Sequence, residues 1–437
     1  MTSWTGSRSR PPSFRHRLKA KLLPAPTRVV ESASPSGAYH HPVSVERIVV
    51  VGSGGAGTKA AESLRQRGYD GSLTLVTADP HPPYARPPLS KVYLRGELEL
   101  EKFFLALPDE LDLRLSTTVA EIGDREIVLD SGERLPFDRL LLATGSEPRR
   151  LPGAELTGIH YLRNIENSDA IREAAQAGHR AVVIGAGFIG SEVAASLRQL
   201  GLEVTLVEGG RLPLEHVFGP EIGTFYRDLH VAEGVDVLTG AKLAGFDGNG
   251  AVKAARLEDG RTLEADLVVV GIGVSPRTEL AEAAGLEVEN GVLVSERLET
   301  SVPGIFAAGD IALAEHPFYG SRLRVEHWFT AANMGPVAAA NMLGGDEPYD
   351  RIPYFYSDQF DTKMEYSGYA PKWDGVVLRG DPESRSVMAF WLENDRVIAG
   401  MSINVPDTTE PLEALIRGRE TVDRARLADP DTPLEAL

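Results

Sequence analysis

The chain reads Arg47-Ile48-Val49-Val50-Val51-Gly52-Ser53-Gly54-Gly55-Ala56-Gly57 near its N-terminal end, and this stretch decides the fold. Its apolar run predicts a buried strand over residues 47–51. The residues that follow predict a helix over 56–67 and a second strand over 73–77. In such a turn Gly52 allows the tight bend, Gly54 leaves room for a phosphate, and Gly57 lets the helix pack on the strand. The N-terminus of the helix attracts the same negative charge. The stretch therefore predicts a dinucleotide-binding unit in an α/β protein.

Asp79 strengthens that interpretation because it lies 22 residues after Gly57, where a carboxylate can accept hydrogen bonds from ribose hydroxyls. It also lies a few residues beyond the predicted strand and precedes Pro80, and Asp-Pro is a common turn. The sequence therefore leaves two interpretations of Asp79 open: it binds a ribose, or it only forms a turn.

The same pattern returns 133 positions later, with a strand over residues 181–184, a helix over 188–200 and a strand over 204–207. Gly185, Gly187 and Gly190 take the three glycine roles there. Glu208 closes the second strand, where a carboxylate accepts both ribose hydroxyls and repels a 2′-phosphate, so the unit favours NADH. Arg211 could bind a 2′-phosphate, and the sequence leaves NADPH open.

Composition restricts the chemistry that two such units can support. The 437 residues predict two or three domains, and the absence of cysteine excludes thiol nucleophiles, redox disulfides and protein-held iron–sulfur clusters. The net charge of -18 argues against nucleic acid as a partner, no apolar run is long enough to cross a membrane, and the ten histidines form no metal-ligand spacing. We expect a flavin at the first site and a nicotinamide at the second.

The predicted architecture is α/β, with two Rossmann-like dinucleotide-binding domains and a small C-terminal α+β domain. The predicted boundaries are a basic disordered arm over 1–45, a discontinuous FAD-binding domain over 46–155 and 288–346, an NAD(P)-binding domain over 156–287, and the C-terminal domain over 347–437. The last domain is expected to hold strands over 375–379, 387–392 and 397–403 and a helix near 411–417. The arm lacks the apolar segment of a secretory signal, and we expect the protein in the cytoplasm.

Five further motifs support a resemblance to a known family. They are Tyr84-Ala85-Arg86-Pro87-Pro88-Leu89-Ser90-Lys91, Leu142-Ala143-Thr144-Gly145-Ser146, Ala308-Gly309-Asp310, Val325-Glu326-His327-Trp328 and Tyr356-Ser357-Asp358-Gln359. With both glycine loops, they make the chain resemble the ferredoxin reductase family of FAD-dependent pyridine-nucleotide oxidoreductases. The resemblance implies that hydride passes from NADH to FAD, and single electrons then pass to a [2Fe–2S] ferredoxin that serves a cytochrome P450 or an oxygenase. Ala85 departs from the family, which often has an acidic residue there.

The resemblance also implies roles for individual residues. Lys91, paired with Glu192, would lie beside flavin N5 as the catalytic pair, with a surface salt bridge as the alternative interpretation. Asp310 would bind the ribityl chain, and Trp328 would contact the flavin ring or simply belong to the core. The other implied cofactor-binding residues are Ala56, Val119, Thr144, Gly145, Arg163 and Gly309 for FAD, and Gly271 and Gly273 for the nicotinamide.

Three rival functions share this fold. Flavin oxidases, peroxidases and disulfide reductases that act through a thiol need a cysteine, which this chain lacks. A quinone reductase would need an apolar or amphipathic membrane-binding segment near its C-terminus, whereas residues 411–437 are acidic and interrupted by prolines. A redox-sensing NADH-binding flavoprotein resembling apoptosis-inducing factor stays open as the alternative.

Docking of a ferredoxin needs a local basic patch. Residues 1–45 carry a net +6, which leaves about -24 on the remainder, and ferredoxins are usually acidic. Arg322, Arg324 and Lys363 are the candidates, because the first two precede Trp328 and the third follows the Ser-Asp-Gln motif.

Overall fold

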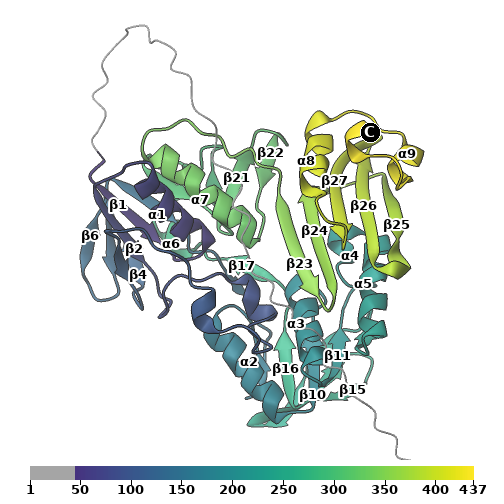
Figure 1. Cartoon of the computed structure of the whole chain (residues 1–437). Helices are drawn as coiled ribbons and strands as arrows, with labels where there is room; N and C mark the ends of the chain where they lie inside the picture. Colours follow the sequence, from purple (N-terminus) through teal and green to yellow (C-terminus); the bar gives the residue numbers. More distant parts are fainter. Residues whose placement is uncertain (1–44) are drawn as a thin grey trace, which may run out of the picture. The chain divides into compact units, whose positions relative to one another are not determined.

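A computed structural model of the chain describes residues 45–437, so the arm predicted over residues 1–45 lies outside the described residues except for Val45. The first glycine loop belongs to a five-stranded parallel sheet with the order β20-β7-β1-β2-β3. Its elements are β1 (Arg47–Val51), α1 (Gly55–Gln66), β2 (Ser72–Val76), β3 (Asp112–Arg114), β7 (Arg139–Leu142) and β20 (Ile305–Ala307). Figure 1 shows β1, α1 and β2 in purple.

The apolar sequence of β1 explains its central place in this sheet. Parallel strands are covered on both faces, so they need side chains that can be buried on both sides. Ile48, Val49 and Val50 are at most 2% exposed, and each pairs with β2 on one side and β7 on the other. The helix α1 covers one face together with α7 (Trp328–Met342), which lies alongside it in Figure 1.

The second glycine loop belongs to another five-stranded parallel sheet, with the order β12-β11-β10-β16-β9. Its strands are β9 (Ile159–His160), β10 (Arg180–Ile184), β11 (Glu203–Val207), β12 (Asp236–Leu238) and β16 (Leu267–Val270). Its helices are α2 (Ile165–Ala177), α3 (Phe188–Gln199), α4 (Glu215–Phe218) and α5 (Pro220–Ala232). The strand that carries the loop, β10, lies at the centre as β1 does, so the two loops hold equivalent positions in their sheets.

Small sheets, in which all strand pairs but one are antiparallel, complete these two units. One contains β4 (Val119–Ile122), β5 (Glu126–Leu129) and β6 (Arg134–Pro136); another contains β13 (Leu243–Asn249), β14 (Ala251–Leu257) and β15 (Thr262–Glu264). A third contains β18 (Val288–Glu289), β19 (Gly291–Val294), β21 (Ala312–His316) and β22 (Ser321–Leu323). The pair β8 (Ser146–Pro148) and β17 (Val274–Pro276) joins the two units, and α6 (Glu279–Ala283) packs against β4.

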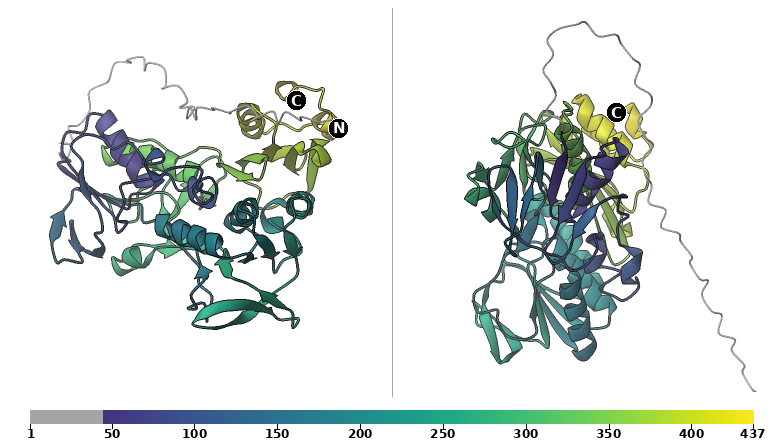
Figure 2. Two further views of the ribbon diagram at one scale, coloured as in Figure 1. Left: turned by 60° about the horizontal axis from the view of Figure 1, so that its bottom comes forward. Right: turned by 90° about the vertical axis from the view of Figure 1, so that its left-hand side faces the viewer.

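The C-terminal residues form a five-stranded antiparallel sheet with the order β23-β24-β27-β26-β25. The strands are β23 (Tyr354–Gln359), β24 (Thr362–Gly368), β25 (Gly375–Asp381), β26 (Ser386–Glu393) and β27 (Arg396–Ile403), and the helices are α8 (Thr409–Gly418) and α9 (Arg424–Ala428). The edge strand β23 packs against α3 and α7, which belong to the two parallel units. Figure 2 shows this sheet in green and yellow.

The predicted fold class is confirmed, and the elements end within two residues of their predicted bounds. The first predicted helix, over 56–67, is α1 (Gly55–Gln66), and the last, near 411–417, is α8 (Thr409–Gly418). Among residues 45–437, no helix is both long and apolar enough to cross a membrane. The four domain boundaries stay a prediction.

Candidate functional site

Both glycine loops line one cavity, which has a volume of about 1610 Å³. Pockets for a single small ligand usually measure ~300–1000 Å³, so this one has room for two extended molecules. It reaches from Asp79 and Val119 in the first unit to Glu208 and Lys242 in the second. Lys91 and Glu192 line its middle.

The first loop has the geometry of a phosphate cradle. Gly52 has a φ of +107°, and a Cβ there would lie 2.2 Å from the carbonyl oxygen of Ala143. A Cβ on Gly57 would lie 1.9 Å from the carbonyl oxygen of Gly52, so this glycine lets α1 approach β1. At Gly54, the N-cap of α1, a Cβ would meet nothing within 4 Å. The open space at Gly54 lies where the N-terminus of α1 offers unpaired N–H groups.

The second loop repeats this geometry. A Cβ on Gly185 would lie 2.4 Å from the carbonyl oxygen of Gly271, and one on Gly190 would lie 1.9 Å from that of Gly185. Gly187, the N-cap of α3, again faces open space. Gly57 and Gly190 do not line the cavity, which fits the packing role predicted for the third glycine of each loop.

Glu208 lies at the end of β11, where the sequence places the ribose ligand. Its two carboxylate oxygens accept hydrogen bonds of 2.7 Å from the backbone N–H groups of Ala186 and Gly210, and the side chain lines the cavity. Arg211, the alternative ligand for a 2′-phosphate, is 81% exposed and pairs with Glu215. Arg211 does not line the cavity, whereas Glu208 does.

Asp79 lies in a turn at the cavity wall, and its role toward a ribose stays a prediction. It lines the cavity, and its Oδ1 accepts a hydrogen bond of 3.1 Å from the backbone N–H of His81, as a turn residue does. Its Oδ2 accepts a hydrogen bond of 2.8 Å from the hydroxyl of Tyr84. Burial raises the pKa of Tyr84 well above its usual range, so this hydroxyl keeps its proton and stays a donor.

The predicted pairing of Lys91 with Glu192 is present, and it is buried rather than on the surface. Lys91 Nζ lies 2.6 Å from Glu192 Oε2, and the two side chains are only 10% and 4% exposed. The hydroxyls of Ser90 and Ser357 donate to the same carboxylate at 2.5 and 2.7 Å. Because a buried charge is tolerated only when it is paired and hydrogen-bonded, these contacts fix Lys91 at the cavity wall.

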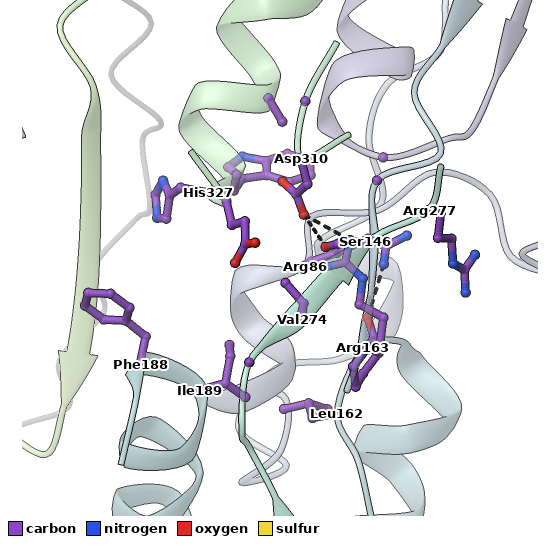
Figure 3. Close-up of a pocket in the computed structure, with 18 of the residues that line it drawn as sticks. Arg86, Ser146, Leu162, Arg163, Phe188, Ile189, Val274, Arg277, Asp310 and His327 are labelled. Atoms are coloured by element: carbon purple, nitrogen blue, oxygen red, sulfur yellow. Dashed lines mark hydrogen bonds and ion pairs between the residues drawn. The ribbon is translucent and has the colours of Figure 1, made fainter. Parts of the chain in front are cut away.

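Asp310 lies in the turn after β20 and accepts hydrogen bonds from Ser146 at 2.7 Å and Arg163 at 3.2 Å (Figure 3). Gly309 precedes it with a φ of +81°. Burial lowers the pKa of Arg163 to about 10, and the neighbouring charge of Arg86 acts in the same direction. The Nε of Arg163 is buried without a hydrogen-bond partner among the described residues. Arg163 as a whole lines the cavity, where Asp310 holds one end of its guanidinium.

Trp328 begins α7 and lies against the first loop. A Cβ on Gly55 would lie 3.2 Å from two ring carbons of Trp328, so the ring leaves no room for a side chain at that position. His327 caps the helix, since its Nδ1 accepts a hydrogen bond of 3.1 Å from the N–H of Phe329. Burial, and then the charge of Lys91, lowers the pKa of His327 to about 4, so its imidazole is neutral near pH 7.

The structure brings nearly all of the predicted site residues together. Besides those above, the cavity is lined by Ala56, Thr144, Gly145, Gly271 and Gly273. Sequence reasoning did not assign roles to Gly55, Ser90, Ser146, Arg277 and Ser357, although Ser90, Ser146 and Ser357 stand in the quoted motifs. The motifs indicated that these three serines lie near the site. A motif does not show which side chain a serine contacts.

The suggested basic docking patch is wrong for Arg324. Its side chain is only 8% exposed, pairs with Glu326 at 2.6 Å and donates to the backbone oxygen of Asp310 at 3.2 Å. Arg322 pairs with Glu315 on the neighbouring strand, and Lys363 is exposed near the turn between β23 and β24. Whether Arg322 and Lys363 contact a partner stays a prediction.

Comparisons with known proteins agree with this geometry. The sequence profile of the pyridine nucleotide-disulphide oxidoreductases matches residues 46–335, and a reductase C-terminal profile matches residues 354–437. The chain belongs to the pyridine nucleotide-disulphide oxidoreductase family.

Individual members of the pyridine nucleotide-disulphide oxidoreductase family are similar over most of their length. Putidaredoxin reductase of Pseudomonas putida is 36% identical over 90% of this chain and 96% of the relative. The ferredoxin–NAD(+) reductase component of the anthranilate 1,2-dioxygenase system of Burkholderia cepacia is 36% identical over 90% of this chain and 100% of its own. The crystal structure of a covalent putidaredoxin reductase–putidaredoxin complex superimposes with a TM-score of 0.86, at 36% identity, over 89% of this chain and 97% of that one.

The residues present fit two adenine dinucleotides. Each loop leaves the position of its second glycine open, the cavity volume suits two such molecules, and the cationic side chain of Arg163 lines the same cavity. FAD would be held between the first loop, Arg163, Asp310 and Trp328. A nicotinamide dinucleotide would be held by the second loop.

Proposed function

We propose that this protein is an FAD-dependent ferredoxin–NAD(+) reductase that supplies electrons to a cytochrome P450 or another oxygenase. The observation that carries the proposal is the single cavity lined by both glycine loops, with the Lys91–Glu192 pair between them. When bound, FAD accepts hydride from NADH and passes electrons on singly. No cysteine is present on which the chain itself could keep them.

The proposed role of the protein is to position the two cofactors and to set the charge around them. The glycine loops direct the N-termini of α1 and α3 toward two diphosphates, and Asp310 receives ribityl hydroxyls. Glu208 selects NADH over NADPH by accepting ribose hydroxyls and repelling a 2′-phosphate. Bringing the nicotinamide and the flavin to within ~3–3.5 Å supplies the proximity on which transfer depends.

Lys91 is proposed to hold a proton, and hence a positive charge, at Nζ beside the flavin ring. Glu192 keeps the ammonium in place, because its Oε2 accepts from Lys91 at 2.6 Å. The Trp328 ring, which packs against Gly55 and lines the cavity, is proposed to contact the flavin ring. Within this proposal the domains keep their predicted boundaries, and the protein acts in the cytoplasm on a [2Fe–2S] partner.

The proposal is tested by spectroscopy and turnover of the purified protein. We expect flavin absorbance bands, bleaching by NADH at lower concentrations than by NADPH, and rapid reduction of an added [2Fe–2S] ferredoxin. Protein that stays colourless after incubation with FAD would refute the proposal. Slow ferredoxin reduction, together with a reduced form that persists in air with bound NAD+, would instead indicate a redox sensor.

A further inference from the structure

Glu192 accepts hydrogen bonds from three side chains, which belong to two other parts of the chain. Oε2 accepts from Lys91 and Ser90, which follow the Pro-Pro turn of the first unit, and Oε1 accepts from Ser357 on β23 at 2.7 Å. Glu192 itself belongs to α3 of the second unit. The carboxylate therefore lies where the two dinucleotide-binding units and the C-terminal sheet meet.

The contact with Ser357 continues into a buried row of side chains. Gln359 Nε2 donates to Ser357 Oγ at 3.3 Å, and His230 Nε2 lies 2.9 Å from Gln359 Oε1. Ser357, Gln359 and His230 are each at most 1% exposed. His230 lies on α5 of the second unit, so the row runs from α5 through β23 to the wall of the cavity.

Every hydrogen bond of this row points toward Glu192. An amide oxygen only accepts, so His230 Nε2 carries the hydrogen in its contact with Gln359. Burial lowers the pKa of His230 to about 4, so the ring is neutral near pH 7 and can still donate through Nε2. Gln359 then donates to Ser357, and the Ser357 hydroxyl donates to the carboxylate. Donors aligned in this way polarise one another, which strengthens the last bond, the one to the charged group.

We propose that Ser357 is a positioning residue for electron transfer: from the C-terminal sheet it holds Oε1 of Glu192, so that the carboxylate contacts Lys91 through Oε2 alone. This inference rests on the proposed function. Without the Ser357 donor, Oε1 has no hydroxyl partner and turns to Lys91. The ammonium is then shared between both oxygens of the carboxylate, which neutralise more of its charge, so it stabilises negative charge on the reduced flavin less well.

The test uses Ser357→Ala in the FAD-loaded, full-length protein. We expect the flavin midpoint potential to fall by ~30 mV, which is a tenfold change in a two-electron equilibrium. We expect the rate constant of flavin reduction at saturating NADH to fall about tenfold, the size of one hydrogen bond to a charged group, with an unchanged Kd for NADH. Ser357→Thr, which keeps the hydroxyl, should restore both quantities.

Ser402→Ala is the matched control, because Ser402 is a similarly buried serine two strands away in the same sheet. It should leave the potential unchanged. If Ser357→Ala does not fold, Gln359→Met serves instead, and we expect a smaller shift of the same sign. An unchanged or higher potential, or an equal shift in Ser402→Ala, would overturn the inference. Failure of the wild-type protein to bind FAD or to oxidise NADH would instead refute the proposed function.

Discussion

Glu208 is the residue on which we propose that the choice of coenzyme depends. Two backbone N–H groups hold its carboxylate at the cavity wall, where it can accept from a ribose and repel a phosphate. We expect Glu208→Ala to lower the ratio of kcat/KM for NADH to that for NADPH at least tenfold, since hydrogen bonds to a charged group contribute about 1.5–3 kcal/mol. Steady-state turnover with ferricyanide and either coenzyme measures this ratio.

Arg211→Ala provides the control for that experiment. The guanidinium is exposed, pairs with Glu215 and does not line the cavity. We therefore expect the coenzyme ratio of Arg211→Ala to equal that of the wild-type protein. A large change of the coenzyme ratio in Arg211→Ala, with none in Glu208→Ala, would show that the arginine and not the glutamate contacts the adenosine ribose of the coenzyme.

In the two glycine loops, neighbouring glycines have different physical roles. A methyl group at Gly54 or Gly187 would enter open space in front of a helix N-terminus, and both residues have φ near -70°, which alanine adopts without strain. We expect Gly54→Ala to fold and to lose affinity for FAD. We expect Gly187→Ala to retain FAD and to show a raised KM for NADH.

The third glycine of each loop provides the contrast. At Gly57 and Gly190 a Cβ would lie 1.9 Å from a backbone carbonyl oxygen, so alanine there must push the helix away from its strand. Both variants should lose thermal stability, measured by circular dichroism, in addition to cofactor affinity. If Gly54→Ala proves as unstable as Gly57→Ala, the second glycine has a packing role and does not face a ligand.

The contact between α1 and α7 depends on a glycine that the sequence did not reveal. A Cβ on Gly335 would lie 2.4 Å from the carbonyl oxygen of Ala56 and 2.8 Å from the backbone nitrogen of Ala60. We expect Gly335→Ala to reduce the free energy of unfolding by about 1–3 kcal/mol, the usual cost of overpacking. Gly418→Ala, at the end of α8 with nothing within 4 Å of its Cβ, should be neutral or slightly stabilising in the same urea titration.

The helices, strands and glycine loops of the whole molecule could be predicted from local sequence patterns. The contacts between residues that are distant in the sequence could not, because they depend on how the elements pack. The strand and helix around Gly52 follow from apolar periodicity and turn chemistry that act over about twenty residues, and β1 and α1 match their predicted bounds closely. The contact between Ser357 and Glu192 joins residues 165 positions apart. Burial of Arg324 likewise depends on long-range packing, so its position just before Trp328 in the sequence did not reveal that it is buried.

The buried histidine on α5 makes the stability of the whole molecule sensitive to acid. The pKa of His230 is about 4 in the folded protein, against 6.5 for an ordinary histidine, because burial disfavours its charged form. The unfolded chain therefore binds more protons between pH 6.5 and pH 4, and stability falls as the pH is lowered through that window. From pH 7 to pH 5 we expect His230 to account for a loss of about 2 kcal/mol in the free energy of unfolding, measured by urea titration. In His230→Leu the loss should be smaller by that amount even if the variant is less stable at pH 7, whereas an equal loss in both proteins would show that His230 is protonated in the folded state.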